Sequence, residues 1–215
     1  MALDVRTFTV GPFQENCYVV REPGAEHAIV IDPGDEPERL IAAVRALAVT
    51  VDAILLTHTH IDHIGAVAPL ARETGAPVYC PALERHVLAD IDAVYGALGF
   101  PGRESYEADE LLSGGEGLTL AGLDLEVLFT PGHSQGHVTY AIPAHETMLD
   151  GDVLFRGSVG RVDLPGGDWP TLLASITTLI ERHPPQTVVL PGHGPRTTLG
   201  EERASNPFLT ELAGR

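Results

Sequence analysis

Short apolar runs separated by polar turns fill the beginning of the chain. Apolar and polar side chains alternate over residues 3–10, and apolar runs follow at 17–20 and 28–31, with Gly-Pro and Pro-Gly pairs between them. Because side chains alternate across a strand and these pairs mark turns, the pattern predicts an antiparallel meander. Apolar residues then recur at helical spacing over 36–47, and the run 51–56 is typical of a buried strand.

The following segments are mainly helical by the same criterion. Apolar positions predict a helix from about Asp62 to Glu73, with Asp62 at its N-cap, and a short strand at 78–80. Residues 81–98 have a broken helical pattern. The acidic segment 100–112 is irregular, and two interpretations stay open, a lid over a site or a solvated surface loop.

Strands return in the second half of the chain. We expect them at 117–121, 123–129, 138–142, 147–149 and 187–190, and a polar tail with some helical character ends the chain. Asp168, as N-cap, and Pro170 begin a helix that runs to Ile180. Two runs of mainly antiparallel strands, each followed by helices, predict an α/β (α+β) sandwich of two sheets with helices on both outer faces.

Composition and charge narrow the class of protein. The 215 residues show no internal break, so we expect a single domain over residues 1–215. A net charge of −17 argues against nucleic acid and anionic membranes as partners, and an anionic substrate would need local cations. Without a secretion signal or a membrane-spanning stretch, we expect a cytoplasmic protein in which Cys17 and Cys80 are buried, reduced thiols.

Three imidazoles and a carboxylate lie close together directly after the run 51–56. They belong to His58, His60, Asp62 and His63. If the chain is still extended here, His58 and His60 point to the same side, and the next turn can add the other two. Neutral imidazole with carboxylate suits zinc, iron or manganese. The alternative, a His-rich surface turn, is disfavoured because the cluster joins a buried strand to a helix, where loops usually carry function.

Three later turns have the same construction. Each is an apolar strand, then a turn rich in Gly or Pro, then one ligand-type residue, and these residues are His133, Asp152 and His193. Glycine lets the backbone turn sharply and approach an ion closely. Taken alone, each residue would more often be a surface or turn residue than a ligand. Beside the first cluster, all three become candidate ligands.

The number of candidates favours two metal ions over one. Seven ligand-type residues exceed the four of a closed zinc site. They fit two ions with one bridging carboxylate and open positions for a shared water. Two such ions can polarise a carbonyl and lower the pKa of that water towards ~7. Zinc is the favoured metal, and iron or manganese accepts the same donors.

These motifs resemble the metallo-β-lactamase superfamily, above all its small glyoxalase II-like (hydroxyacylglutathione hydrolase-like) branch. The first matches the family's T-H-x-H-x-D-H motif, and the later ones are Thr-Pro-Gly-His-Ser-Gln-Gly-His, Gly-Asp-Val-Leu-Phe and Gly-His-Gly-Pro. The resemblance implies a four-layered αβ/βα sandwich of two mixed, mainly antiparallel sheets, with the site at one edge of both. It also implies that one metal is held by His58, His60 and His133, the other by Asp62, His63 and His193, and that Asp152 bridges them.

Three further side chains are candidates to support this site. Asp62 is a ligand if both metals are bound, and with only the first metal it could act as a base or orient the water. Ligand imidazoles need hydrogen-bond partners, and Thr57 and Asp32 are our candidates. Asp32 could equally be a turn residue that ends its strand.

The resemblance implies hydrolysis of a small-molecule thioester such as S-lactoylglutathione by metal-bound hydroxide. Arg161 and Arg196 are candidates to bind a substrate carboxylate, because Arg holds carboxylates bidentately. A loop-bracing ion pair of Arg161 with Asp163 or Asp168 is the alternative. Only 22 residues follow His193, so we expect no C-terminal helical domain of the kind that binds glutathione in larger glyoxalase II enzymes. Selective binding of a glutathione conjugate is therefore in doubt.

Other reactions fit the same residues. In a persulfide (sulfur) dioxygenase, one iron would be held by two histidines and Asp152, the ligand set of non-haem iron oxygenases. A lactonase would use the same two metals on another ester. A β-lactamase is disfavoured because the antibiotic enzymes of the family are usually exported. The presence of His63 and His193 favours two metals. We expect the protein to be a monomer or a homodimer.

Overall fold

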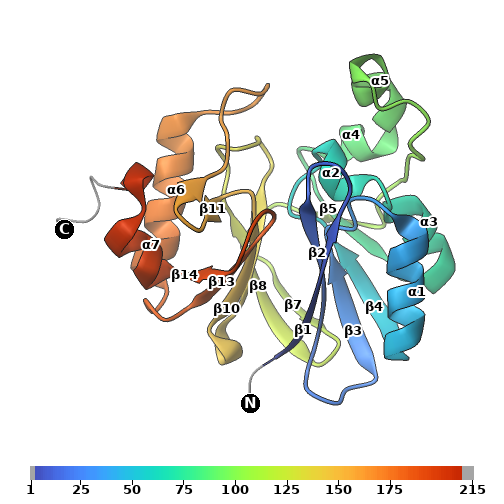
Figure 1. The fold of residues 1–215 in the computed structure, drawn as a ribbon, viewed down its shortest axis with the longest axis horizontal. Helices are drawn as coiled ribbons and strands as arrows, with labels where there is room; N and C mark the ends of the chain where they lie inside the picture. The colour runs from blue at the N-terminus through green and yellow to red at the C-terminus, as the bar shows by residue number, and fades with distance from the viewer. Residues whose placement is uncertain (1–2, 210–215) are drawn as a thin grey trace.

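Two six-stranded sheets pack face to face, and helices cover the outer side of each sheet (Figure 1). The computed structural model describes residues 3–209, so the last part of the predicted helical tail lies outside the described residues. The arrangement confirms the predicted sandwich of two mixed sheets with helices on both outer faces.

The first sheet combines two antiparallel strand pairings with three parallel ones. Its strands, in spatial order, are β1 (Asp4–Val10), β2 (Glu15–Arg21), β3 (His27–Ile31), β4 (Thr50–Leu55), β5 (Val78–Pro81) and β6 (Glu110–Leu112). The predicted meander of β1, β2 and β3 is confirmed, whereas β3 to β6 pair in parallel. Strand β6 lies in the segment predicted to be irregular. Its order comes from pairing with β5, a contact that local periodicity does not reveal.

Six short helices accompany this sheet. They are α1 (Pro37–Leu47), α2 (Ile61–Ile64), α3 (Val67–Thr74), α4 (Arg85–Ala89), α5 (Ile91–Tyr95) and the 3-10 turn η1 (Gly96–Leu98). The single helix predicted for 62–73 is wrong: it is divided at Gly65 and Ala66. The Ala66 N–H donates to Pro33 O at 2.9 Å, outside the helical hydrogen-bond pattern, which interrupts the helix. Asp62 is therefore not an N-cap; His60 holds that position.

The second sheet is mostly antiparallel. Its strands, in spatial order, are β14 (Thr197–Thr198), β13 (Val188–Pro191), β10 (Thr147–Gly151), β9 (Val138–Ile142), β8 (Leu123–Phe129) and β7 (Gly117–Leu120). A small hairpin of β11 (Leu154–Phe155) and β12 (Ser158–Val159) follows β10.

The helices of the second half are η2 (Pro143–His145), α6 (Trp169–Arg182), α7 (Leu199–Ser205) and η3 (Pro207–Leu209). The predicted cap of α6 is confirmed, because Asp168 accepts a hydrogen bond from Thr171 N at 2.9 Å. Helices α1 and α3 cover the outer face of the first sheet, and α6 and α7 cover that of the second (Figure 1).

Apolar side chains fill three layers, one between the sheets and one under the helices of each side. Two polar contacts tie the sheets together just before the histidine cluster. The hydroxyl of buried Tyr140 donates to Leu56 O at 2.7 Å, and Val138 N–H donates to Thr57 O at 2.9 Å. These contacts fix the end of β4 against β9, and with it the start of the histidine cluster.

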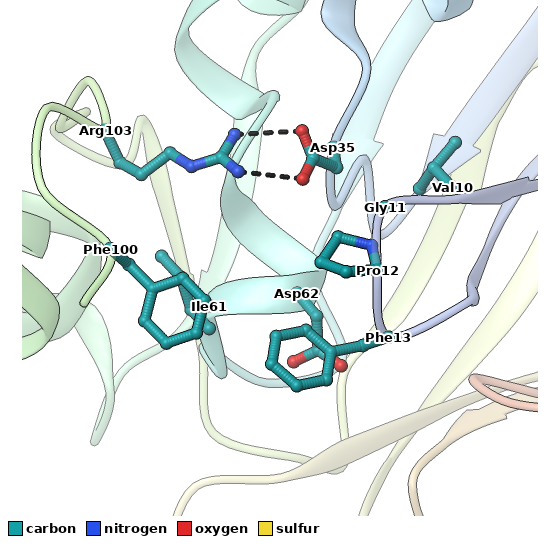
Figure 2. A pocket seen from close by; sticks show the side chains of 9 residues that line it. All are labelled: Val10, Gly11, Pro12, Phe13, Asp35, Ile61, Asp62, Phe100 and Arg103. Carbon is teal, nitrogen blue, oxygen red and sulfur yellow. Dashed lines mark hydrogen bonds and ion pairs between the residues drawn. The ribbon is translucent and has the colours of Figure 1, made fainter. Parts of the chain in front are cut away.

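The segment 100–112 contacts the loop between β1 and β2. Figure 2 shows Phe100 and Phe13 near Asp62, and their ring centroids are 5.7 Å apart. In the same view, Arg103 donates to both oxygens of Asp35, at 2.9 and 2.8 Å. The segment is thus anchored through Phe100 and Arg103, beside Asp62 of the histidine cluster. Its role as a lid stays a prediction.

Two further expectations concern membranes and thiols. Within residues 3–209, no helix combines the length and the apolar character that crossing a membrane requires. Cys17 and Cys80 are buried and free, as predicted.

We expect Tyr140→Phe to lower the free energy of unfolding by about 1–3 kcal/mol, because it leaves the buried Leu56 carbonyl without its donor. The measurement is urea unfolding followed by circular dichroism. Tyr106→Phe is the matched control, since its hydroxyl bonds to Asp109 at the surface and should matter by less than about 0.5 kcal/mol. Equal losses in the two variants would contradict the proposed tie between the sheets.

Candidate metal centre

All seven predicted ligand residues meet at one edge of the two sheets. His58 and His60 lie in the loop after β4, and Asp62 and His63 lie in α2. The second sheet supplies the other three residues from the turns that follow β8, β10 and β13, namely His133, Asp152 and His193. Strand ends of both sheets therefore deliver the side chains, as the repeated strand–turn–ligand pattern predicts.

His58, His60 and His133, the first ligand group, offer three nitrogens within 4.8 Å of one another. Nδ1 of His60 lies 2.8 Å from Nε2 of His133. Nε2 of His58 is buried and has no hydrogen-bond partner among the described residues. Three converging nitrogens of this kind can hold one metal ion.

Asp62, His63 and His193 form a second ligand group, with donor atoms that are also within 4.8 Å of one another. Oδ2 of Asp62 lies 3.3 Å from Nε2 of His193. Nε2 of His63 is buried and, among the described residues, has no hydrogen-bond partner. The geometry suits a second ion beside the first.

Asp152 lies between the two ligand groups. Its Oδ2 is 3.4 Å from Nε2 of His133 and 3.5 Å from Nε2 of His193, and its Oδ1 is 3.4 Å from Nε2 of His63. The carboxylate thus faces donors of both groups, the position that a bridging ligand requires. Its Oδ1 is buried without a hydrogen bond in the described part of the chain.

A hydrogen-bond relay from Asp32 sets the tautomer of two imidazoles. Thr57 donates to Asp32 through its N–H at 2.8 Å and its hydroxyl at 2.7 Å. Because that hydroxyl proton is used, His58 Nδ1–H must donate to Thr57 Oγ1, 3.0 Å away, which leaves a lone pair on Nε2. His63 Nδ1–H likewise donates to Asp32 at 3.0 Å. The predicted support of the imidazoles by Asp32 and Thr57 is confirmed.

Asp32, His58 and His63 also lie close enough to suggest a third metal group. The relay argues against it, because both Asp32 oxygens already accept hydrogen bonds. A buried carboxylate that orients ligand histidines is the usual partner of a metal site.

His137 was not predicted to have a role, yet it is buried against the first ligand group. Its ring stacks on His58, with centroids 5.0 Å apart. Its Nε2 accepts a hydrogen bond from Asp152 N at 3.1 Å, so its Nδ1–H donates to Thr130 Oγ1 at 3.0 Å. With its nitrogens used in this way, His137 positions the backbone of Asp152. Its place in the His133 motif was the available sequence signal.

Glu84 is a second residue that the sequence did not reveal. Its Oε2 accepts from Thr59 N at 2.7 Å and Thr59 Oγ1 at 3.0 Å, and its Oε1 accepts from Gly136 N at 2.8 Å and from the Ser134 hydroxyl. One buried carboxylate therefore joins the His58–His60 loop to the His133 loop. No motif surrounds Glu84, and its partners are distant in sequence.

Glycines allow the ligand turns to pack this tightly. A Cβ on Gly192 would lie 2.3 Å from Oδ1 of Asp152 and 2.7 Å from Cε1 of His63. A Cβ on Gly160 would lie 1.9 Å from the Asp152 carbonyl oxygen. Glycine thus allows a close backbone approach to Asp152 at these two positions, and the predicted approach of the backbone to an ion stays a prediction.

Burial and charge keep the first ligand group neutral. Burial, and then the charge of neighbouring imidazoles, holds the pKa of His58 well below its usual value and lowers the pKa of His60 to about 4. Burial also lowers the pKa of His133. Neutral imidazoles present the lone pairs that a metal needs.

The second ligand group is governed by its carboxylates. Burial alone would lower the pKa of His63 and His193, but Asp32, Asp62 and Asp152 outweigh it and raise both. The pKa of Asp152 is held far below its usual value, because the neighbouring imidazoles outweigh its burial. In the absence of metal, charge is thus shared between carboxylates and imidazoles of this group.

The chemistry of the donor set fits divalent metal ions. Nε2 of His58, Nε2 of His63 and Oδ1 of Asp152 are buried atoms without hydrogen bonds in the described residues, and all three face the cluster. Leaving a buried polar atom unpaired costs about 1–3 kcal/mol, so such a set calls for an additional partner. Imidazole and carboxylate donors suit zinc, iron and manganese alike.

The side chains of the two predicted substrate-binding arginines belong to neither ligand group. Arg161 donates to both oxygens of Asp163, at 2.6 and 2.7 Å, which is the loop-bracing pair considered as the alternative. Its carbonyl accepts the His133 Nδ1–H at 2.8 Å. Arg196 lines a separate groove with Leu3, Val5 and Leu190. Contact of either side chain with a substrate stays a prediction.

Known proteins resemble this chain in both sequence and fold. A family model described as the metallo-beta-lactamase superfamily matches residues 10–193. The chain is 34% identical to hydroxyacylglutathione hydrolase GloC of Haemophilus influenzae, over 96% of this chain and 98% of GloC. Among solved structures, the BLEG-1 B3 metallo-beta-lactamase is 41% identical with a TM-score of 0.90, and TTHA1623 in a di-iron-bound form is 45% identical with a TM-score of 0.83. The matches cover 96% of this chain and 100% of BLEG-1, and 95% of this chain and 100% of TTHA1623.

We expect Gly192→Ala to weaken metal binding at least about tenfold, because the added methyl group would displace the Asp152 carboxylate. Competition with a chromogenic chelator measures the affinity. Gly117→Ala in β7 is the control, since a Cβ there meets no atom within 4 Å. An unchanged metal affinity in Gly192→Ala would show that Asp152 does not contribute to the site.

Glu84→Gln should weaken metal binding about 10- to 100-fold, because an amide nitrogen then faces two of the four donors and loosens both ligand loops. The same variant should lower the free energy of unfolding by about 1–3 kcal/mol. Chelator competition and urea unfolding measure the two effects. Glu107→Gln, at an exposed glutamate, is the control. Wild-type values for Glu84→Gln would rule out its bridging role.

Proposed function

Because the chain belongs to the metallo-β-lactamase superfamily, we propose that it is a metal-dependent hydrolase that cleaves thioesters in the manner of glyoxalase II. The observation that supports this most is Asp152, which faces both ligand groups and so suits a pair of ions with a shared water. The 34% identical relative named hydroxyacylglutathione hydrolase supports a thioester as the substrate class.

In this proposal the first ligand group holds one ion, the second ligand group holds the other, and Asp152 bridges them. Zinc is our first choice. Iron is the alternative because the 45% identical TTHA1623 has been solved in a di-iron-bound form. Both metals accept the imidazole and carboxylate donors present here.

The bound ions would polarise the thioester carbonyl and make a water acidic enough to react near neutral pH. The chain supplies orientation and one proton acceptor. With both ions bound, Asp62 is a ligand of the second. With only the first ion bound, Asp62 is that acceptor: its side chain is 18% exposed, so its carboxylate can reach both a bound water and solvent. Water adds to the carbonyl carbon, the C–S bond breaks, and the products are a carboxylic acid and a thiol. A thiol with a pKa near 8.5 leaves as thiolate with little help from a general acid.

Hydrolysis of β-lactams is a second candidate, because the 41% identical BLEG-1 is named a B3 metallo-beta-lactamase. The two reactions share an attack of water on a carbonyl and differ in the leaving group. The leaving group of a β-lactam is an amine nitrogen, which must be protonated as it leaves. A thiolate leaves without being protonated. Asp62 is more exposed than Asp32 and Asp152, but its lowered pKa, which its hydrogen bond to His193 favours, disfavours a role as proton donor.

The test is a substrate panel on metal-loaded protein, comprising S-lactoylglutathione, neutral acyl thioesters, lactones, cephalosporins and glutathione persulfide with an oxygen electrode. We expect thioesterase activity to exceed the other activities and to disappear on chelation. Oxygen uptake with persulfide would show a dioxygenase instead. β-Lactam hydrolysis in excess of thioesterase activity would favour the second candidate.

Asp62→Asn should lower kcat for a thioester by about 10²–10⁴, because the amide is a poorer ligand for the second ion and cannot accept a proton from the attacking water. The first ligand group does not contain Asp62, so we expect at least one metal per chain to remain. Steady-state kinetics and elemental analysis on the same sample measure both. A kcat within twofold of wild type would exclude Asp62 both as the base and as a required ligand of the second ion.

A further inference from the structure

A cavity of about 360 Å³ borders the first ligand group beside His60. The apolar part of its wall is built mainly from three segments, namely the turn before α4, the α5–η1 region and the loop before α6. Each contributes exposed apolar side chains: Leu83, Val94, Leu98 and Leu164. The lining is completed by α4 and by the loops of His60 and His133. Figure 1 shows α4 and α5 standing beyond the end of the first sheet, where this wall lies.

The concentration of exposed apolar residues at this cavity is unusual for the chain. Eight large hydrophobic side chains are exposed among the described residues, and four of them line this one cavity. Leu98 is 68% exposed and Leu83 is 61% exposed, so neither contributes to the core. Grouped apolar side chains at the surface usually mark a binding site.

The polar groups of the cavity are largely committed elsewhere. Both Glu84 oxygens accept hydrogen bonds from the ligand loops. The Tyr95 hydroxyl donates to Thr59 O at 3.0 Å. What remains for a ligand is mainly hydrocarbon, together with the imidazole of His86 and the amide of Gln135.

The cavity also lacks the cations that an anionic substrate needs. All 13 basic residues of the chain are arginines, and none of the twelve within residues 3–209 lines this cavity. The net charge of −17 repels anions in addition. Glutathione has two carboxylates, which arginine would normally bind. The lining therefore favours an uncharged group.

We propose that this cavity binds an uncharged aliphatic acyl chain, so that the preferred substrates are thioesters of alkanoic acids and not of lactate on glutathione. The inference rests on the proposed function, since it places the scissile carbonyl at the first ligand group beside His60. The acyl arm is assigned to the cavity because it is the arm of a thioester that can consist of hydrocarbon alone. A volume of about 360 Å³ is within the range of small-molecule sites.

Binding of non-hydrolysable analogues tests the cavity without using activity. S-alkyl-N-acetylcysteamine thioethers, from methyl to octyl, are titrated calorimetrically onto the metal-loaded protein. Each added methylene should lower Kd about fourfold until the cavity is filled. S-octylglutathione should bind no more tightly than its neutral N-acetylcysteamine counterpart.

Variants at the exposed leucines locate the effect. The double variant Leu83→Ser with Leu98→Ser should raise the Kd of the octyl thioether on the order of tenfold, because it removes two apolar walls. Leu111→Ser is the matched control, since Leu111 is also exposed, at 43%, and lies on β6 outside the cavity. Kinetics with acetyl to octanoyl thioesters should show the same dependence on chain length in kcat/KM.

The outcomes separate this inference from the proposed function. Hydrolysis of thioesters with a Kd that does not vary with chain length would overturn the cavity assignment and leave the hydrolase standing. Absence of hydrolysis with a chain-length-dependent Kd would overturn the hydrolase and support the cavity. An unchanged octyl Kd in the double variant, with a shift in sedimentation from dimer to monomer, would make the leucine wall an interface between copies and overturn the inference.

Discussion

The carboxylate of Asp32 is the contact on which the rest of the site depends. It ends β3, is almost fully buried, and accepts hydrogen bonds from Thr57 and His63. Through the Thr57 hydroxyl it also fixes the tautomer of His58, so one side chain prepares an imidazole of each ligand group. Its φ of 49° is unfavourable for a residue other than glycine, and the three hydrogen bonds stabilise it. Strain of this kind is common where a backbone is held for function.

Asp32 can act in this way because the two sheets are tied together at the same edge. Tyr140 and Val138 on β9 bind Leu56 and Thr57 at the end of β4. Glu84 makes a second connection between the two halves, because its carboxylate accepts hydrogen bonds from the loops of His60 and His133. The ligands thus come from two sheets, but hydrogen bonds across the interface hold them as one unit. The apolar cavity lies beside the Glu84 tie, next to the most exposed ligand of the first group.

The sequence was sufficient to predict which seven residues meet at the candidate site, because the patterns are local. Four of them directly follow a buried strand, and three follow an apolar strand and a Gly- or Pro-rich turn. The sequence also predicted the meander of β1 to β3 and the cap of α6, which depend on neighbouring residues. What it missed depends on distant contacts. Strand β6 forms because it pairs with β5, and the break between α2 and α3 arises from a hydrogen bond to Pro33. The role of Glu84 depends on two loops that lie elsewhere in the chain. His137 had a signal, its place in the His133 motif, but its hydrogen bond to Asp152 requires the fold.

The central claim is a pair of metal ions that share Asp152, and stepwise metal reconstitution tests it most directly. Metal-free protein receives zinc in increments, and bound zinc and thioesterase activity are measured at each step. The account predicts saturation at two ions per chain, with most of the activity appearing as the second ion binds. Saturation at one ion with full activity would contradict the shared site.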